Sequence, residues 1–213
     1  MTLPDLAVQI VYARLGWGMV CAALLVAALR RHSIGKRWQA GLMAVLAFAV
    51  MWLPGPVSPA YWLGLVFQFP SAALVAVCAV SVSRPGLPAR PAPTSWRIGA
   101  IVLAAGGAML YLDSAGWTSL ELYALGADPR LAPLVALVLG MVGLGALRAA
   151  STRPTGLVLL ASVVAFCVFR LPSGNLFDAL LDPLLWFGSL GLTVGVAWRH
   201  LRRSGIPARP SAA

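Results

Sequence analysis

The chain has 213 residues, of which 60% are hydrophobic and only 10% are charged, and its formal net charge is +10. This composition is too apolar for a water-soluble domain of this length and predicts an all-α, polytopic integral membrane protein. The positive charge does not favour nucleic acid as a partner, because the basic residues stand beside apolar runs, where they orient helices and meet anionic lipid headgroups.

Seven apolar stretches predict about seven transmembrane helices in a single bundle over residues 1–203. In chain order the predicted spans are 6–29, 38–53, 61–82, 97–112, 131–147, 156–171 and 183–198. The first span is expected to be retained as a helix, because it lacks the basic flank and small-residue cleavage site of a signal peptide. Short helical pieces are expected at the outer interface at 118–125 and 176–181, and residues 204–213 are expected to form a flexible cytoplasmic tail.

The second span, 38–53, has an alternative as a re-entrant segment that continues into the third span. That alternative would place the basic cluster at 30–37 and the basic loop at 84–97 on opposite faces of the membrane. A full crossing keeps both clusters on the cytoplasmic side, so the charges favour seven crossings.

Charge also sets the orientation of the predicted bundle. Thirteen of the sixteen Lys and Arg residues fall in segments that alternate with the segments holding all six acidic residues. The positive-inside rule then predicts a multi-pass protein of the cell inner (plasma) membrane with its N-terminus outside and its C-terminus inside. The three basic residues outside this pattern are Arg14, Arg130 and Arg170.

Cysteine and histidine do not predict a cofactor or a metal site. Cys21, Cys78 and Cys167 lie inside apolar spans without paired spacing, which favours packing roles. His32 and His200 are placed where they could ligate a haem from two helices, but their Arg-rich surroundings favour contact with lipid headgroups. Phosphate-binding and nucleotide-binding loops are absent from the sequence.

Helix capping explains most of the acidic residues. Ser58, Asp128 and Asp182 each precede a proline and an apolar run, the pattern of an N-cap followed by proline at the first helical position. Asn175 and Asp178 resemble a capping box, in which the carboxylate returns to the amide of the cap, and Thr118–Glu121 has the same pattern. The spacing of Asp178 and Asp182 also suits a divalent cation, but capping already gives both residues a role.

Four polar residues are not explained by capping and form a candidate ligand-binding or intramembrane polar cluster: Arg14, Gln68, Asp113 and Arg170. Asp113 follows the end of an outward-running helix, where the helix dipole disfavours negative charge, so Arg170 on the same face is its expected partner. Arg14 lies about 13 Å along the first helix from Asp5, where a guanidinium either snorkels outward or pairs with an anion. Gln68 either joins that cluster or bonds a neighbouring helix.

Gly191 and Gly195 in the last span are candidates for close helix contact, as are the glycines at 140–145. Minimal loops, capped charges and small-residue faces together favour a noncatalytic subunit or scaffold of a larger inner-membrane assembly, with lipids and other membrane subunits as partners. The alternative is a small transporter or membrane enzyme that handles an anionic or lipidic substrate in an outward-facing pocket lined by the four polar residues.

Overall fold

The computed structural model describes residues 5–31, 37–83 and 94–204 and contains only helices and connecting segments there. The all-α class predicted from the composition is therefore confirmed. The helices are α1 (Leu6–Arg31), α2 (Arg37–Met51), the 3-10 helix η1 (Gly55–Val57), α3 (Pro59–Phe67), α4 (Ala72–Val82), α5 (Thr94–Ser114), α6 (Leu122–Leu125), α7 (Leu131–Ala146), α8 (Arg153–Phe169), α9 (Leu176–Leu180) and α10 (Pro183–Ser204).

The third predicted span, 61–82, is not one helix. It divides into α3 and α4, which are separated by residues 68–71, and Gln68 at the break has a positive φ of 58°. Pro70 explains the break, because it has no amide hydrogen and disfavours helical backbone in the residue before it. The expected pieces at 118–125 and 176–181 contain α6 and α9, both shorter than expected. The expected tail lies outside the described residues except for Ser204, the last residue of α10.

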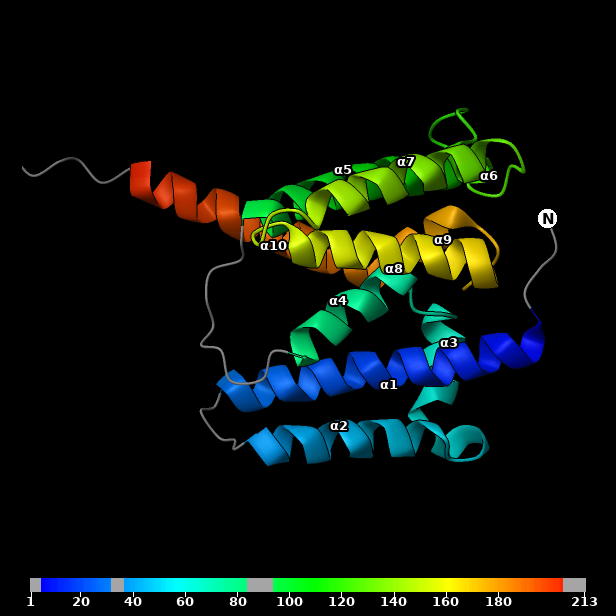
Figure 1. Cartoon of the computed structure of the whole chain (residues 1–213), viewed down its shortest axis with the longest axis vertical. Helices are drawn as coiled ribbons and strands as arrows, with labels where there is room; N and C mark the ends of the chain where they lie inside the picture. The colour runs from blue at the N-terminus through cyan, green and yellow to red at the C-terminus, as the bar shows by residue number, and fades with distance from the viewer. Residues whose placement is uncertain (1–4, 32–36, 84–93, 205–213) are drawn as a thin grey trace, which may run out of the picture.

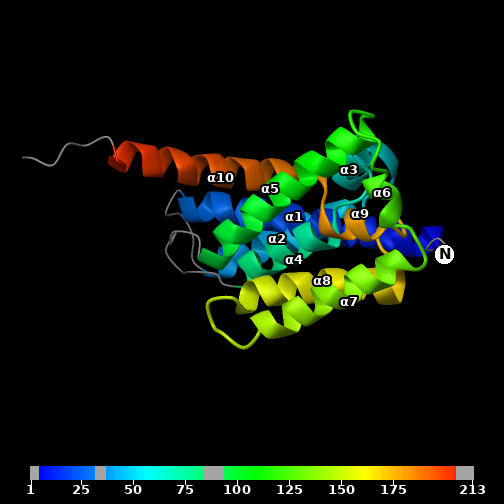
Figure 2. The same ribbon diagram turned by 90° about the horizontal axis from the view of Figure 1, so that it is seen from above.

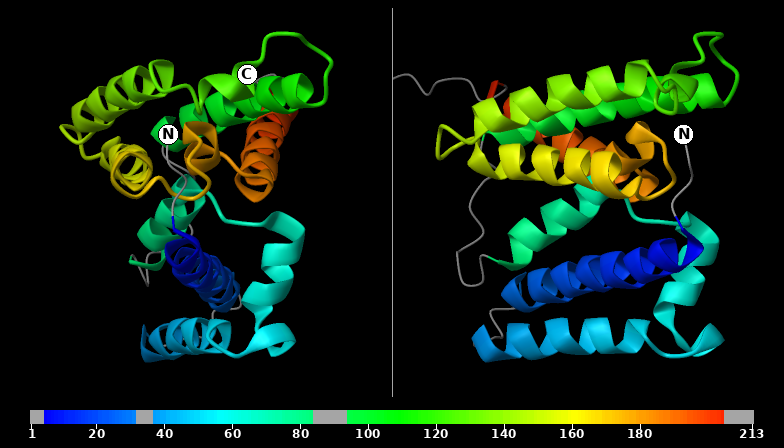
Figure 3. Two further views of the ribbon diagram at one scale, coloured as in Figure 1. Left: turned by 90° about the vertical axis from the view of Figure 1, so that its right-hand side faces the viewer. Right: turned by 45° about the vertical axis from the view of Figure 1, so that its right-hand side comes forward.

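Most of the long helices run side by side, while α3 crosses the direction of the others (Figure 1). The end-on view separates three helix pairs, α1 with α2, α7 with α8, and α5 with α10 (Figure 3). Helix α4 contacts α1, α8, α9 and α10, so it joins these pairs. The C-terminal part of α10 projects beyond the other helices (Figure 2).

The two ends of the bundle carry opposite charge. Five of the six acidic residues lie at the end where α1 begins, α5 ends and α6 and α9 lie, the right-hand end of Figure 1. The sixth, Asp182, precedes α10, which begins nearer the middle of the bundle (Figure 2). The opposite end holds the described basic residues of the helix termini and of the connection between α7 and α8: Arg30, Arg97, Arg148, Arg153, Arg199 and Arg202. The folded chain thus keeps the separation of charge that the sequence shows.

Two groups of buried side chains form the core. The first surrounds Trp17 and Met51, each 1% exposed, and joins α1 and α2 to α4. The second surrounds Phe166 and Leu176, and joins α8 and α9 to α7 and the start of α4. Helix α4 contributes to both groups, which places the broken helix at the centre of the fold.

Gly143 and Gly156 permit the close packing of α7 on α8. A Cβ added to Gly156 would lie 2.6 Å from the carbonyl oxygen of Gly143, closer than van der Waals contact allows. Small residues let transmembrane helices approach in this way. Gly143 is one of the three glycines from which the sequence predicts close contact. A Cβ added to Gly140 would make only ordinary contact with Val163, at 3.9 Å, and one added to Gly145 would meet no described atom within 4 Å.

Two helices are long and apolar enough to cross a membrane by length and composition, Leu6–Arg30 and Ser95–Ser114. Four further apolar helices are shorter, namely those at Trp38–Met51, Ala72–Val82, Leu131–Ala146 and Arg153–Phe169. Only 39% of the Leu6–Arg30 window and 17% of the Ser95–Ser114 window are buried within the structure. The core helix of a soluble protein would be mostly buried, so these two helices weakly indicate membrane association.

Candidate functional site

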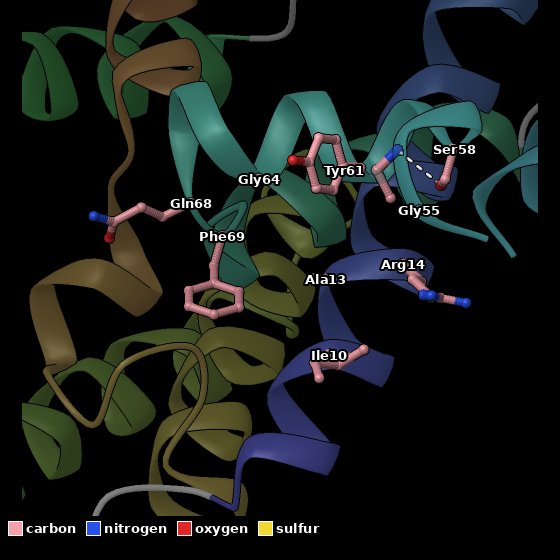
Figure 4. Close-up of a pocket in the computed structure, with 10 residues that line it drawn as sticks. Ile10, Ala13, Arg14, Gly55, Ser58, Tyr61, Gly64, Gln68 and Phe69 are labelled. Carbon is pink, nitrogen blue, oxygen red and sulfur yellow. Dashed lines mark hydrogen bonds between the residues drawn. The ribbon is translucent and has the colours of Figure 1, made fainter. Parts of the chain in front are cut away.

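A pocket of about 370 Å³ lies between α1 and the segment that contains η1 and α3. Ile10, Ala13 and Arg14 line it from α1, and Tyr61 and Gln68 are among the residues that line it from the other side (Figure 4). Its volume falls within the range of small-molecule sites. The pocket therefore brings together two of the four predicted cluster residues, Arg14 and Gln68.

The guanidinium of Arg14 lies over the ring of Trp52, with 5.3 Å from Cζ to the ring centroid. Trp52 directly follows Met51, the last residue of α2, so Arg14 stands level with the end of that helix. The side chain of Arg14 is half-buried. Among the residues that the structure describes, Arg14 contacts no carboxylate; its guanidinium is attracted to the face of the indole ring, which carries no net charge.

Gln68 is the C-cap of α3, and its amide donates a hydrogen bond to the carbonyl oxygen of Gly64. Its side chain is exposed and points away from the side chain of Arg14 (Figure 4). The two residues therefore border one pocket without contacting each other. The carbonyl oxygen of Gln68 accepts a hydrogen bond of 3.4 Å from Nε1 of Trp17 on α1.

Side chains from other helices bond the backbone groups that the break between α3 and α4 leaves without helical partners. The hydroxyl of Tyr12 donates to the carbonyl oxygen of Pro70 at 2.7 Å. The amide of Ser71 donates to Oδ2 of Asp182 at 2.7 Å, and the other oxygen of Asp182 accepts from the amide of Leu185 at 2.8 Å. Asp182, which is 8% exposed, thus caps α10 and binds the beginning of α4.

Asp113 lies apart from the pocket and binds the connection that follows α5. Its carboxylate accepts hydrogen bonds from Oγ1 of Thr118 at 2.5 Å, from the amide of Leu120 at 3.1 Å and from the amide of Leu122 at 2.6 Å. These donors, rather than Arg170, satisfy the carboxylate. Glu121 is the N-cap of α6 and makes no side-chain cap bond, so the expected capping box at Thr118–Glu121 is absent. Thr118 and the first amide of α6, that of Leu122, donate to the carboxylate of Asp113 instead.

Arg170 is the C-cap of α8 and has a positive φ of 56°. Its Cζ lies 5.3 Å from the ring centroid of Phe166, one turn earlier in the chain. The amide of Arg170 bonds to the carbonyl oxygen of Phe166. This geometry directs the guanidinium along its own helix, and Arg170 does not line the pocket that contains Arg14 and Gln68.

The predicted caps make the following hydrogen bonds. Oγ of Ser58 accepts from the amide of Ala60 at 3.2 Å, and Oδ1 of Asn175 accepts from the amide of Phe177 at 2.8 Å. Asp128 accepts from the amides of Arg130 and Leu131, at 2.7 and 2.9 Å. These two bonds, that to Leu131 first, hold the pKa of Asp128 below its usual value.

Asp178 does not return to the amide of Asn175, as the capping-box pattern predicts. That amide instead donates to Oγ of Ser173 at 3.3 Å, and Asp178 accepts hydrogen bonds from the hydroxyls of Ser173 and Tyr123. The bond from Tyr123 is 2.8 Å long. Burial, and then the bond to Asp178, raise the pKa of Tyr123 well above its usual value. Asp178 therefore joins α9 to α6.

Gly191 and Gly195 have open space beside them. A Cβ added at either position would meet no atom within 4 Å in the described part of the chain. Neighbouring side chains on α10 are also exposed, Val194 at 64% and Trp198 at 57%. No other described helix of this chain therefore packs closely on Gly191 and Gly195, whereas Gly143 and Gly156 lie in close contact.

A short repeated pattern marks the C-terminal ends of α3 and α8, and it is not among the features predicted from the sequence. Val66-Phe67-Gln68-Phe69-Pro70-Ser71 matches Val168-Phe169-Arg170-Leu171-Pro172-Ser173 at four positions out of six. In both segments a helix ends at the second residue, a phenylalanine, and the third residue is its C-cap, with φ of 58° at Gln68 and 56° at Arg170. The shared Val-Phe-x-x-Pro-Ser pattern was the available signal for the break between α3 and α4.

No group of three or more His, Cys, Asp or Glu side chains that could hold a metal ion occurs within the described residues. Most of the described carboxylates instead accept hydrogen bonds from backbone amides and hydroxyls, and Arg14 lines the pocket between α1 and α3. Comparisons with protein-family models, curated proteins and solved structures give no match for this chain.

Proposed function

We propose that this chain is a multi-pass protein of the cell inner membrane with seven crossings, its N-terminus outside and its C-terminus inside. In this arrangement α3 and α4 together form the third crossing, and α1, α2, α5, α7, α8 and α10 form the others. The opposite charges at the two ends of the bundle support it, because the basic end corresponds to the cytoplasmic side.

The apolar sides of the bundle support the same proposal. A large apolar side chain is about two-thirds exposed on each of five long helices: Leu24 at 65%, Val102 at 63%, Met141 at 65%, Val168 at 65% and Val194 at 64%. Soluble monomers rarely expose apolar patches that extend over several helices. Lipid chains would cover these side chains in a bilayer.

Within the membrane, we infer a noncatalytic role as a subunit or scaffold of a larger assembly. The observation that carries this function is the open face of α10 at Gly191 and Gly195. Small residues at a spacing of four allow a second helix to approach closely. The chain uses such an approach between Gly143 and Gly156 but leaves the α10 face open, so we assign this face to a helix of another subunit.

Mild-detergent purification of the tagged protein, followed by mass spectrometry of the co-purifying proteins, tests the subunit role. We expect a stoichiometric membrane partner that is lost in the double variant Gly191→Leu/Gly195→Leu. The matched control is Gly41→Leu on α2, because a Cβ at Gly41 also meets open space. Retention of every partner by the double variant would contradict the assigned face, and a protein that purifies alone would contradict the subunit role.

One observation favours the second function, a small transporter or membrane enzyme for an anionic or lipidic substrate. That observation is the pocket beside Arg14, since a half-buried cation without a carboxylate partner among the described residues suits an anion. Arg14→Ala separates the two functions, and Asp113→Asn, which changes a residue apart from the pocket, is its control. Loss of turnover with intact assembly in Arg14→Ala would favour transport or catalysis, whereas unchanged activity of the assembly would favour the subunit.

A further inference from the structure

We infer that the pocket between α1 and α3 binds the phosphate group of an outer-leaflet phospholipid, with Arg14 as the phosphate ligand. This inference rests on the membrane setting proposed above and names the ligand class of the pocket. It does not depend on whether the chain acts as a subunit or as a transporter.

The position of Arg14 corresponds to the headgroup level of the outer leaflet rather than to the membrane interior. Counted along α1, Arg14 lies about 13 Å from Asp5, which suggests depth in the bilayer. However, Trp52 beside it follows the end of α2, and Tyr61 and Trp62 lie on α3 nearby. All three rings are substantially exposed, at 49%, 44% and 57%. Trp and Tyr gather at the membrane–water interface, so these rings indicate the level of the headgroups.

The chemistry of Arg14 suits a phosphate at this level. The contact of Arg14 with the face of the Trp52 ring does not occupy all five N–H donors of the guanidinium, so donors remain for a further partner. Two parallel N–H groups match two phosphate oxygens in a bidentate contact. Since Arg14 has no carboxylate neighbour in the described part of the chain, a bound phosphate would supply the missing negative charge.

The remaining walls of the pocket suit the apolar part of a lipid. Ile10, Ala13 and Phe69 provide apolar surface, and Ile10 is 46% exposed. Gly64 on α3 leaves space in the wall, because a Cβ there would meet no described atom within 4 Å. A cationic group at one edge and an apolar cavity beside it match a phosphate joined to acyl chains better than a free, fully hydrated anion.

Three ligands distinguish the possible sources of the phosphate. Dioleoyl phosphatidic acid carries both the phosphate and the acyl chains, dioleoylglycerol carries only the chains, and glycerol 3-phosphate carries only the polar group. Binding of the two lipids to the purified full chain is measured by native mass spectrometry in mild detergent, and binding of glycerol 3-phosphate by calorimetry. We expect phosphatidic acid to bind more tightly than either partial ligand.

Two variants of the pocket and two matched controls locate the site. Arg14→Gln removes the charge, and Gly64→Leu adds a bulky side chain to the pocket wall, at a position where a Cβ meets no described atom within 4 Å. Each should weaken binding of phosphatidic acid by about tenfold or more, the loss expected for a charge-assisted hydrogen bond. Arg130→Gln, at an exposed position on the same end of the bundle, and Gly41→Leu should leave binding unchanged.

Several results would overturn the inference. Equal binding of phosphatidic acid by the wild type and by both pocket variants would place the lipid elsewhere. Equal binding of dioleoylglycerol would remove the role of the phosphate, and equal binding of glycerol 3-phosphate would assign the pocket to a free anion. If Arg14→Gln fails to fold, Gly64→Leu still decides between these results. Labelling of the two ends of the bundle in intact cells tests the membrane setting separately.

Discussion

Oδ2 of Asp182 accepts a hydrogen bond of 2.7 Å from the backbone amide of Ser71, 111 residues earlier in the chain. This bond joins the N-terminal ends of two helices, because Ser71 is the N-cap of α4 and Asp182 directly precedes α10. Both helix N-termini present partial positive charge, which a shared carboxylate neutralises. The broken helix at the centre of the fold is therefore held in place by a residue from the far end of the sequence.

Replacing Asp182 should destabilise the fold. Asp182→Ala leaves the buried amides of Ser71 and Leu185 without an acceptor, at a cost of roughly 1–3 kcal/mol for each. Asp182→Asn retains one carbonyl oxygen, so its loss should be smaller. The apparent unfolding temperature of the purified protein in detergent measures both effects. Asp5→Ala, which removes an exposed acceptor at the start of α1, is the control. Equal unfolding temperatures for wild type and Asp182→Ala would contradict the structural role of this bond.

Gly156→Ala should weaken the packing of α7 on α8. The new Cβ would lie 2.6 Å from the backbone oxygen of Gly143, and a backbone group cannot move aside cheaply. Overpacking of this kind costs about 1–3 kcal/mol. Gly145→Ala is the matched control, because its Cβ meets open space and alanine favours the helix. Thermal unfolding of the two variants in the same detergent should rank Gly156→Ala below Gly145→Ala; the opposite order would show that α7 and α8 are further apart than the structure indicates.

Tyr123 should make stability depend on pH in the alkaline range. Burial and the bond to Asp178 raise its pKa in the folded state, so the unfolded chain loses this proton first, near its usual pKa of about 10. The contribution of Tyr123 to the free energy of unfolding is therefore complete below about pH 10. It decreases as the pH rises further, towards the raised pKa of the folded state. Unfolding temperatures of wild type and Tyr123→Phe are compared from about pH 8, below the usual tyrosine pKa, upward. The two curves should converge above about pH 10. A difference that stays constant with pH would contradict the raised pKa.

Asp113→Asn should loosen the connection between α5 and α6 without affecting the pocket beside Arg14. The asparagine side chain cannot accept all three bonds that Thr118, Leu120 and Leu122 now donate to the carboxylate. Hydrogen exchange of the amides of Leu120 and Leu122 should become faster, while lipid binding stays at the wild-type level. Thr118→Val, which removes one of the three donors, should show a smaller change. Loss of lipid binding in Asp113→Asn would instead support the four-residue pocket predicted from the sequence.

The positions of the long helices could be predicted because they depend on local composition. Uncharged apolar runs are typical of helices in an apolar solvent, and the residues before Pro59 and Pro183 indicate where α3 and α10 begin. The same pattern at Asp128-Pro129 ends two residues before the start of α7 at Leu131. The break at residues 68–71 lies inside an uncharged apolar run, so composition does not indicate it. The signals for the break were Pro70 and the Val-Phe-x-x-Pro-Ser pattern that contains it. A search for repeated short patterns would have found Val-Phe-x-x-Pro-Ser at both helix ends.

The partners of the polar residues could not be predicted, because they depend on contacts between distant segments. Asp182 was identified as a local cap, but its bond to Ser71 requires α4 and α10 to meet. Asp113 was expected to need a cation, whereas the following loop folds back and supplies amide and hydroxyl donors. Arg14 and Gln68 were grouped by predicted depth, and the structure brings them to one pocket while their side chains point apart.

Single-cysteine labelling tests the membrane arrangement most directly. Cys21, Cys78 and Cys167 are replaced by alanine, and one cysteine is introduced at Ser114, at the end of α5, or at Ser151, in the connection between α7 and α8. A reagent that does not cross membranes is then applied to intact cells and, separately, to opened cells. We predict that the cysteine at position 114 reacts in intact cells and that the cysteine at position 151 reacts only after the cells are opened. Labelling of both positions from the same side would contradict the seven-crossing arrangement.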